Sequence, residues 1–209
     1  MKVRWAMFIL ALNGSPHKEG NTALLLNNAL AEIRADGVET CLLQIAEGVY
    51  DAQNPFCLYC STPCDGRCYK NTRLEKMLSL LSRADGVLLG SPVYFGTVSA
   101  QLKSFWDKTR MLRREKQLLN VVGGALAVGG SRFGGQETTL RALQDMMLCQ
   151  GMIVVGDAHQ DDDAGHQGAC AQQPAGDDMA GLARTRILAR HVLQVARATA
   201  GLRQRKNVD

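Results

Sequence analysis

The chain has 209 residues, of which 46% are hydrophobic and 21% charged, and its formal net charge is +4. This composition is typical of a globular protein with one α/β domain or two small ones. The small net charge gives no reason to expect nucleic acid as a partner, and no apolar run is long enough to cross a membrane.

Apolar strand-like segments alternate with amphipathic helices along the chain. Strands are predicted at residues 3–13, 38–45, 86–90, 121–128 and 152–156. Helices are predicted at residues 22–34, 72–83, 99–114, 137–150 and 179–200. The apolar start could mimic a secretory leader, but it runs directly into a polar turn, so a strand is favoured. Five alternations predict an α/β fold, a parallel sheet with helices on both faces.

Three segments interrupt this alternation. Residues 46–71 lose regular structure, and within them residues 55–71 form a cysteine-rich insertion. Residues 157–178 are rich in Asp, Gly and Gln and predict a long mobile loop, and residues 201–209 predict a frayed tail. There is no internal repeat and no linker, so we expect a single domain over residues 1–200.

The turn after the first strand is rich in groups that bind anions. It has glycines, two hydroxyls and an amide, and free N–H groups at the start of the next helix suit a phosphate. The candidate residues are Ser15, Pro16, His17, Gly20, Asn21 and Thr22. The alternative is an ordinary turn in which Thr22 caps the helix.

The loops after the third and fourth strands are also unusual. In the former, a proline stiffens the turn, a glycine admits a flat ligand, and an aromatic side chain can cover a ring. Its candidate residues are Pro92, Val93, Tyr94, Phe95 and Gly96. The latter exposes N–H groups at glycines beside one cation, and its candidates are Ser131, Arg132, Gly134 and Gly135. Taken alone, each of these two loops could be an ordinary glycine-containing turn at the end of a strand.

These three loops would meet if the strand order is 2-1-3-4-5. Ligands of such sheets bind beyond the carboxyl ends of the strands, where the strand order reverses. A phosphate pocket beside a stiff, aromatic pocket fits a phosphorylated planar ring. Flavin mononucleotide (FMN) is the natural candidate, and a dinucleotide fits less well because the sheet has one half rather than two.

The motifs resemble those of the flavodoxin-like NAD(P)H-dependent FMN reductase family, and more narrowly its iron–sulfur flavoprotein branch. The resemblance is carried by Gly14-Ser15-Pro16 with Gly20-Asn21-Thr22, by residues 90–96 with 98–103, and by residues 130–132 with 134–138. It implies a flavodoxin-like three-layer sandwich, bound FMN, NAD(P)H as reductant, and a homodimer or homotetramer.

The resemblance also implies roles for the three loops. Ser15, Asn21 and Thr22 would hold the phosphate of FMN. The second loop, residues 92–96, would line the isoalloxazine ring. Residues 131, 132, 134 and 135 would close the other side of the ring.

Four of the seven cysteines lie in one short segment, at Cys57, Cys60, Cys64 and Cys68. Tight grouping argues against a disulfide framework, and compact spacing is typical of [4Fe–4S] ligands. Three interpretations stay open: a [4Fe–4S] cluster, which is favoured; a loop with free or paired thiols; and a structural zinc site. Similar proteins of the iron–sulfur branch have C-x2-C-x2-C with a longer final gap, so the spacing here differs.

A basic run follows the loop of the third strand, at Lys108, Arg110, Arg113, Arg114 and Lys116. The usual explanation is a solvated face. The functional hypothesis is a docking patch for an acidic electron carrier such as ferredoxin. The four histidines join no catalytic constellation.

The favoured function is electron transfer by a cytoplasmic FMN redox protein, with a [4Fe–4S] cluster next to the flavin and a small-molecule electron donor or acceptor. The alternatives are a cluster-free NAD(P)H-dependent FMN or quinone reductase, and a flavin-binding module with little turnover. No catalytic side chain is expected, because the flavin itself carries the chemistry.

Overall fold

The computed structural model describes residues 7–203. The start of the first predicted strand, residues 3–6, lies outside this range, as does most of the predicted tail. The first residues of the predicted tail belong to a short 3-10 turn, η2 (Ala200–Leu202). None of the helices within the described residues is long and apolar enough to cross a bilayer.

A parallel sheet in the order β2-β1-β3-β4-β5 is the frame of the molecule, which confirms the predicted fold class and strand order. The strands are β1 (Phe8–Asn13), β2 (Glu39–Gln44), β3 (Gly86–Pro92), β4 (Val122–Gly129), β5 (Ile153–Val155) and β6 (Ala169–Gln172). The half-exposed strand β2 lies at one edge of the sheet.

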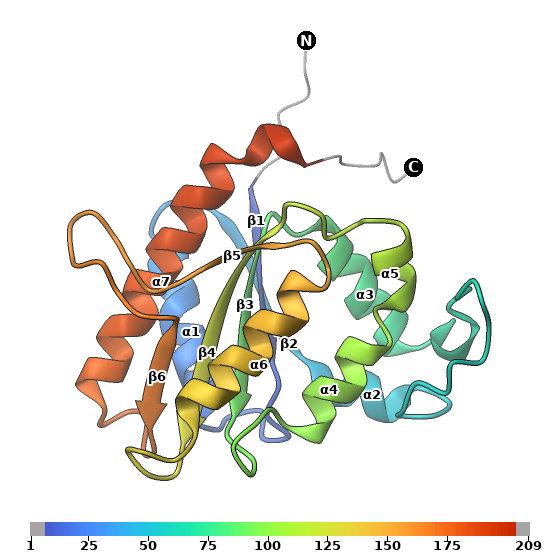
Figure 1. Cartoon of the computed structure of the whole chain (residues 1–209), viewed down its shortest axis with the longest axis horizontal. Coiled ribbons are helices and arrows are strands. Elements are labelled where there is room, and N and C mark those ends of the chain that lie inside the picture. Colours follow the sequence, from blue (N-terminus) through green and yellow to red (C-terminus); the bar gives the residue numbers. More distant parts are fainter. Residues whose placement is uncertain (1–6, 204–209) are drawn as a thin grey trace.

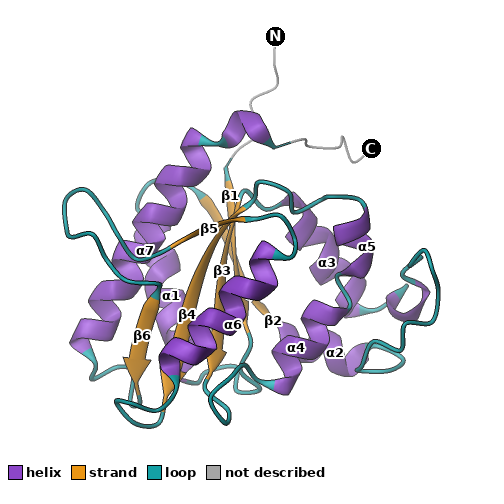
Figure 2. Ribbon diagram, in the orientation of Figure 1, coloured by secondary structure: helices purple, strands orange, loops and turns teal. Residues whose placement is uncertain are grey.

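Helices cover both faces of this sheet and make three layers (Figures 1 and 2). One face packs against α1 (Asn21–Arg34) and α7 (Met179–Ala198). The other packs against α2 (Ile45–Asp51), α3 (Arg73–Arg83), α4 (Ala100–Asp107), α5 (Arg110–Arg114) and α6 (Gln136–Leu148). Side chains alternate between the layers: Leu10 and Leu12 of β1 enter one core, while Ile9 and Ala11 enter the other.

The expectation of one long loop over residues 157–178 is wrong, because strand β6 lies within it. Strand β5 pairs with only the first residues of β4, from Val122 to Gly124. The open edge farther along β4 pairs in parallel with β6, from Leu126 to Gly129. The edge strand is therefore split in two by an excursion over residues 156–168. Strand β6 supplies hydrogen-bond partners for backbone N–H and C=O groups of β4 that would otherwise be unpaired.

Two helix predictions need correction. Residues 46–71 contain helix α2, and a short 3-10 turn, η1 (Arg67–Tyr69), follows the cysteines. The single helix predicted over residues 99–114 is two helices, α4 and α5. The Thr109 hydroxyl donates to the Trp106 carbonyl at 2.7 Å, and the N–H of Lys108 donates to the Phe105 carbonyl. These i−3 bonds end α4 and redirect the chain.

Candidate functional site

The carboxyl ends of β1, β3, β4 and β6 point to one edge of the sheet, at the bottom of Figure 1. The loops after these strands are linked by short contacts. The Gly14 N–H donates to the Gly90 carbonyl at 2.8 Å, and the Val93 N–H donates to the Val128 carbonyl at 2.8 Å. The three loops singled out in the sequence therefore lie side by side. We call this edge the loop rim.

The first loop of the rim, residues 14–20, is held from below by Asn13. The Asn13 side chain accepts from the Ser15 N–H and donates to the His17 carbonyl and to the Gln44 side chain. The Ser15 hydroxyl is buried and accepts from the His17 N–H at 3.1 Å. Pro16 is half-buried between them. One buried amide thus fixes the first half of the loop, because it bonds to the backbone of both Ser15 and His17.

The start of α1 offers unpaired donors to the rim. Helix α1 begins after Gly20, and no side chain caps it. Within the described residues, the N–H groups of Asn21, Thr22 and Ala23 have no acceptor. Because the helix dipole adds partial positive charge there, this turn suits a phosphate. Thr22 is buried and does not cap the helix, contrary to the alternative interpretation of this turn.

The second loop makes a tight reversal at residues 94–97. Tyr94 and Thr97 exchange backbone hydrogen bonds, and Phe95 and Gly96 have φ of 51° and 78°. This left-handed pair is the geometry of a two-residue hairpin turn. It turns the Phe95 ring entirely outward, while Pro92 and Val93 stay half-buried at the base.

The third loop, residues 130–135, is pinned by Gln136. Its amide donates to the Ser131 carbonyl at 2.6 Å, and its carbonyl accepts from the Gly134 N–H at 2.9 Å. Arg132 is exposed and lies 5.6 Å from the ring of exposed Phe133. The loop shape thus depends on one buried glutamine that the sequence analysis missed.

The second and third loops touch at two glycines. A Cβ on Gly135, whose φ is 97°, would lie 3.0 Å from the Gly96 Cα. The Thr138 hydroxyl donates to the Gly96 carbonyl at 2.7 Å. Only glycine at position 135 allows both the left-handed conformation and this approach.

A fourth segment, residues 173–178 after β6, also joins the rim and was missed. The Gln173 N–H donates to the Gly129 carbonyl, and the Ala175 N–H donates to the Asn21 side chain at 2.9 Å. Asn21 therefore uses its carbonyl oxygen within the protein. Pairing of β6 with β4 brings this segment here, and the sequence signal for so short a strand is weak.

The segment with the four clustered cysteines, residues 57–68, forms the loop that projects at the right of Figure 1. The thiols of Cys57, Cys60 and Cys64 are near enough to Cys68 to influence its pKa. Burial, the largest effect, raises the pKa of Cys68, and the Lys108 ammonium lowers it. Within residues 7–203, no three Cys, His, Asp or Glu side chains converge at metal-binding distance. The loop would have to close to bind a metal group.

Basic residues hold this cysteine loop against α4 and α5. The Lys108 ammonium contacts Cys68 Sγ at 3.8 Å, and Arg114 donates to the Cys64 carbonyl at 2.5 Å. The Arg110 guanidinium lies 3.8 Å from the centre of the Tyr59 ring. Burial raises the pKa of Tyr69, and the neighbouring Cys64 and Cys68 raise it further.

The donor set of the loop fits an anionic metal group, since four thiolates around either a [4Fe–4S]²⁺ core or a Zn²⁺ ion carry a net charge of −2. Lys108 is only 2% exposed and faces the thiol of Cys68. A buried ammonium is costly without a counter-charge, and cluster-bound thiolates would supply one.

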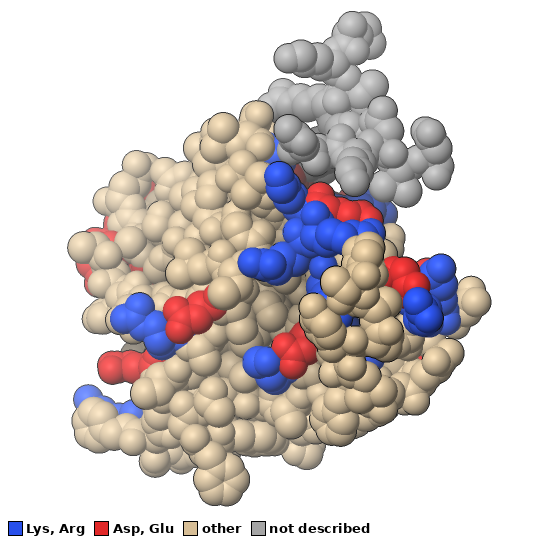
Figure 3. Space-filling view, turned by 45° about the vertical axis from the view of Figure 1, so that its right-hand side comes forward, with Lys and Arg blue, Asp and Glu red and all other residues tan. Residues whose placement is uncertain are grey.

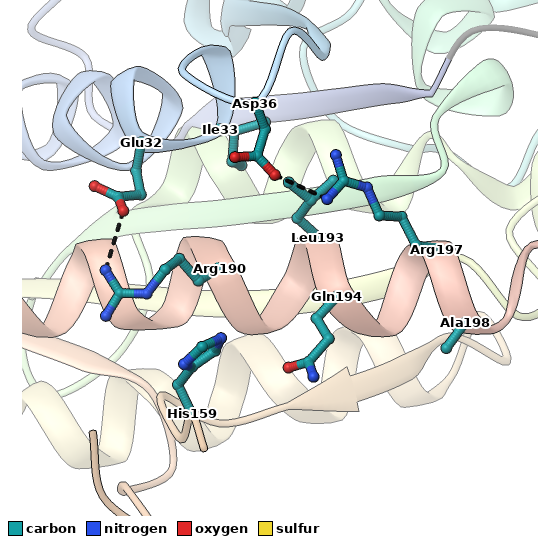
Figure 4. Close-up of a pocket in the computed structure, with 9 residues that line it drawn as sticks. All are labelled: Glu32, Ile33, Asp36, His159, Arg190, Leu193, Gln194, Arg197 and Ala198. Carbon is teal, nitrogen blue, oxygen red and sulfur yellow. Dashed lines mark hydrogen bonds and ion pairs between the residues drawn. The ribbon is translucent and has the colours of Figure 1, made fainter. Parts of the chain in front are cut away.

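The other histidines lie far from the rim and are already engaged. His159 lies beside Asp161 and Asp162, and His191 Nδ1 contacts the Gly156 carbonyl. A groove of about 550 Å³ runs between α1 and α7 (Figure 4). Its guanidiniums are paired across it, Arg190 with Glu32 and Arg197 with Asp36, so no cation is left for a phosphate.

Comparison with known proteins agrees with this geometry. Residues 7–164 match the family model described as NADPH-dependent FMN reductase. An iron–sulfur flavoprotein of Methanocaldococcus jannaschii is 42% identical over 196 residues, 91% of this chain and 98% of that one. An NAD(P)H dehydrogenase (quinone) of Chromohalobacter salexigens is 41% identical over 78 residues, covering 37% of this chain and 39% of its own.

Solved structures agree on the fold. The flavodoxin, WrbA-like protein from Agrobacterium tumefaciens superposes with a TM-score of 0.66 at 19% identity. The superposition covers 93% of this chain and 99% of that one. At this identity the likeness concerns the flavodoxin-like fold alone.

Proposed function

This chain belongs to the NADPH-dependent FMN reductase family, in its iron–sulfur flavoprotein branch, and we propose that it passes electrons between FMN and a [4Fe–4S] cluster. The protein is an FMN-binding oxidoreductase. Bound FMN supplies hydride or single-electron chemistry, and a cluster supplies one electron at a time. The observation that carries the cluster proposal is the group of four cysteines beside the buried cation Lys108.

The rim supplies the parts that FMN needs. Ser15, Asn21 and Thr22, with the unpaired N–H groups of the first turn of α1, hold the phosphate. The segment 92–96 lines the isoalloxazine ring, and the segment 131–135 closes its other side. These residues bind and orient the cofactor, and we assign no proton-transfer role to a side chain.

Cys57, Cys60, Cys64 and Cys68 hold the cluster in this proposal. Protein purified without oxygen should contain about one FMN, four irons and four sulfides per chain. Replacing any of the four with Ser should remove iron and sulfide but leave FMN in place. The matched control is Cys149→Ser, since Cys149 is exposed and outside the loop. Equal iron in all variants, or one zinc per chain, would contradict the proposal.

The second candidate is a cluster-free NAD(P)H-dependent quinone reductase. It is favoured by the lack of three converging metal ligands within residues 7–203 and by the quinone dehydrogenase relative. This candidate predicts NAD(P)H oxidation with quinone by protein that has FMN but no iron, and Ser variants of the four cysteines should be as fast as wild type.

The partners follow from the exposed groups around the rim. Phe95 and Phe133 are 109% and 93% exposed, which suits cover by a second copy in a homodimer or homotetramer. A small-molecule donor or acceptor reaches the flavin, and a ferredoxin in the cytoplasm exchanges electrons with the cluster. Light scattering of the purified protein tests the assembly, and a monomeric mass would rule it out.

A further inference from the structure

Lys108 is a buried cation whose charge is not matched by a carboxylate. Its side chain is 2% exposed, and its hydrogen-bond partners are the Phe56 carbonyl at 3.3 Å and Cys68 Sγ at 3.8 Å. Within residues 7–203, no Asp or Glu lies at ion-pair distance from its ammonium. The other buried charges differ: Asp85 pairs with Arg203, and Asp157 pairs with Arg184.

The break between α4 and α5 fixes where this ammonium lies. Thr109 closes the last turn of α4 by donating to the Trp106 carbonyl, and Gln150 donates to the Thr109 hydroxyl at 2.6 Å. Lys108 is the residue immediately after α4, so the break sets its direction toward the cysteine loop.

We propose that the buried positive charge of Lys108 raises the reduction potential of the iron–sulfur cluster. The proposal rests on the proposed function, in which Cys68 is a cluster ligand. Four thiolates and a [4Fe–4S]²⁺ core carry a total charge of −2. One electron from an external one-electron reductant brings the total to −3, and no bond forms or breaks.

A cation at a buried position favours the more negative of these two states. Solvent screens a buried charge weakly, whereas exposed charges are screened by water and salt. Arg114 also reaches the loop, but its side chain is 41% exposed and already paired with Glu115. Lys108 is therefore the cation beside Cys68 that water and salt screen least.

The test compares wild type, Lys108→Met, Lys108→Arg and the control Lys103→Met. Lys103 lies on α4, the helix that Lys108 follows, but it is exposed and paired with Asp107 at 2.7 Å. Each protein is titrated with dithionite under anaerobic conditions, and the reduced cluster is followed by electron paramagnetic resonance. FMN, iron and sulfide per chain are measured in parallel.

Lys108→Met should lower the ratio of reduced to oxidised cluster at a given potential at least tenfold. For a one-electron couple this is a fall of about 59 mV in midpoint potential. Lys108→Arg should keep the ratio within about threefold of wild type, and Lys103→Met should leave it unchanged. Equal potentials for Lys108→Met and Lys103→Met would overturn the role of Lys108 and leave the proposed function intact.

If Lys108→Met loses its iron but retains FMN, its cluster potential has no value to compare. The arginine variant then decides the outcome. If Lys108→Arg keeps both the iron and the wild-type potential, the charge is what the site requires, and the proposal holds. If Lys108→Arg loses iron as well, the proposal is overturned. Wild-type protein without iron and sulfide would mean that the proposed function has failed, and the inference would fall with it.

Discussion

At the scale of single residues, the rim depends on places where a side chain has no room. Gly135 has a φ of 97°, and a Cβ added to it would lie 3.0 Å from the Gly96 Cα. Gly37, in the turn after α1, has a φ of 71° but nothing within 4 Å of a Cβ. The two glycines share the backbone requirement, and only Gly135 has the close approach.

Gly135→Ala should weaken FMN binding by about tenfold or more, because the second and third loops must move apart. Gly37→Ala should cost roughly 1–2 kcal/mol of stability, from the left-handed conformation alone, and leave FMN affinity unchanged. Fluorescence titration with FMN and urea unfolding measure the two effects. Equal FMN affinity in both variants would show that the glycine contact does not shape the site.

Lys108 shows at the same scale that a residue's type does not fix its role. In the sequence it is the first residue of a basic run, for which the usual explanation is a solvent-exposed helix face. In the structure it is buried against Cys68, while Arg113 and Lys116 of the same run are exposed. The predicted docking patch therefore loses one of its cations.

At the scale of elements, helix α6 shapes the third loop through its first residue. Gln136 holds both the Ser131 carbonyl and the Gly134 N–H. Gln144 lies on the same helix and donates to the Gln167 carbonyl at 2.6 Å, in the excursion between β5 and β6. One helix thus supports two loops with the same kind of side chain.

Gln136→Ala should raise the dissociation constant of FMN by roughly tenfold, since the third loop loses two hydrogen bonds that fix its shape, each worth about 0.5–1.5 kcal/mol. Gln144→Ala makes a similar deletion outside the rim and should leave the dissociation constant unchanged. Equilibrium dialysis with FMN gives both values. An equal effect of the two substitutions would indicate general destabilisation instead.

At the scale of the whole molecule, charge is unevenly distributed. On the face that Figure 3 brings forward, Lys and Arg side chains gather in the upper part. Arg113, Arg114 and Lys116 follow α4 in the chain, and Arg114 contacts the cysteine loop. Such a field would raise the encounter rate with an acidic electron carrier.

The rate of electron transfer from a reduced acidic ferredoxin should therefore fall as salt is added, several-fold between roughly 0.05 and 0.5 M. Arg113→Glu should slow the reaction at low salt and flatten its salt dependence. Arg141 is an exposed residue of α6, and Arg141→Glu makes the same change in charge. It should change neither the rate at low salt nor the salt dependence. Stopped-flow measurement of ferredoxin oxidation tests this, and a salt-independent rate would exclude steering by this face.

Much of the fold could be predicted because its signals are local. The alternation of apolar runs and helical stripes depends on residues a few positions apart, and it predicted the five strands of the main sheet. Their order was expected from the flavodoxin-like fold that the motifs resemble. The three loops at the strand ends were found for the same reason, because glycines, hydroxyls and a proline follow an apolar run directly.

The tertiary structure alone decided the features that join distant segments. Strand β6 exists because β4 has an open edge, and it brings residues 173–178 to Asn21, 154 positions away. Lys108 is buried because a loop 40 positions earlier covers it. The sequence determined which residues could form the elements and the rim, since propensity and periodicity act over one or two turns. Which side chains became buried partners depended on packing between elements, and no local pattern carries that information.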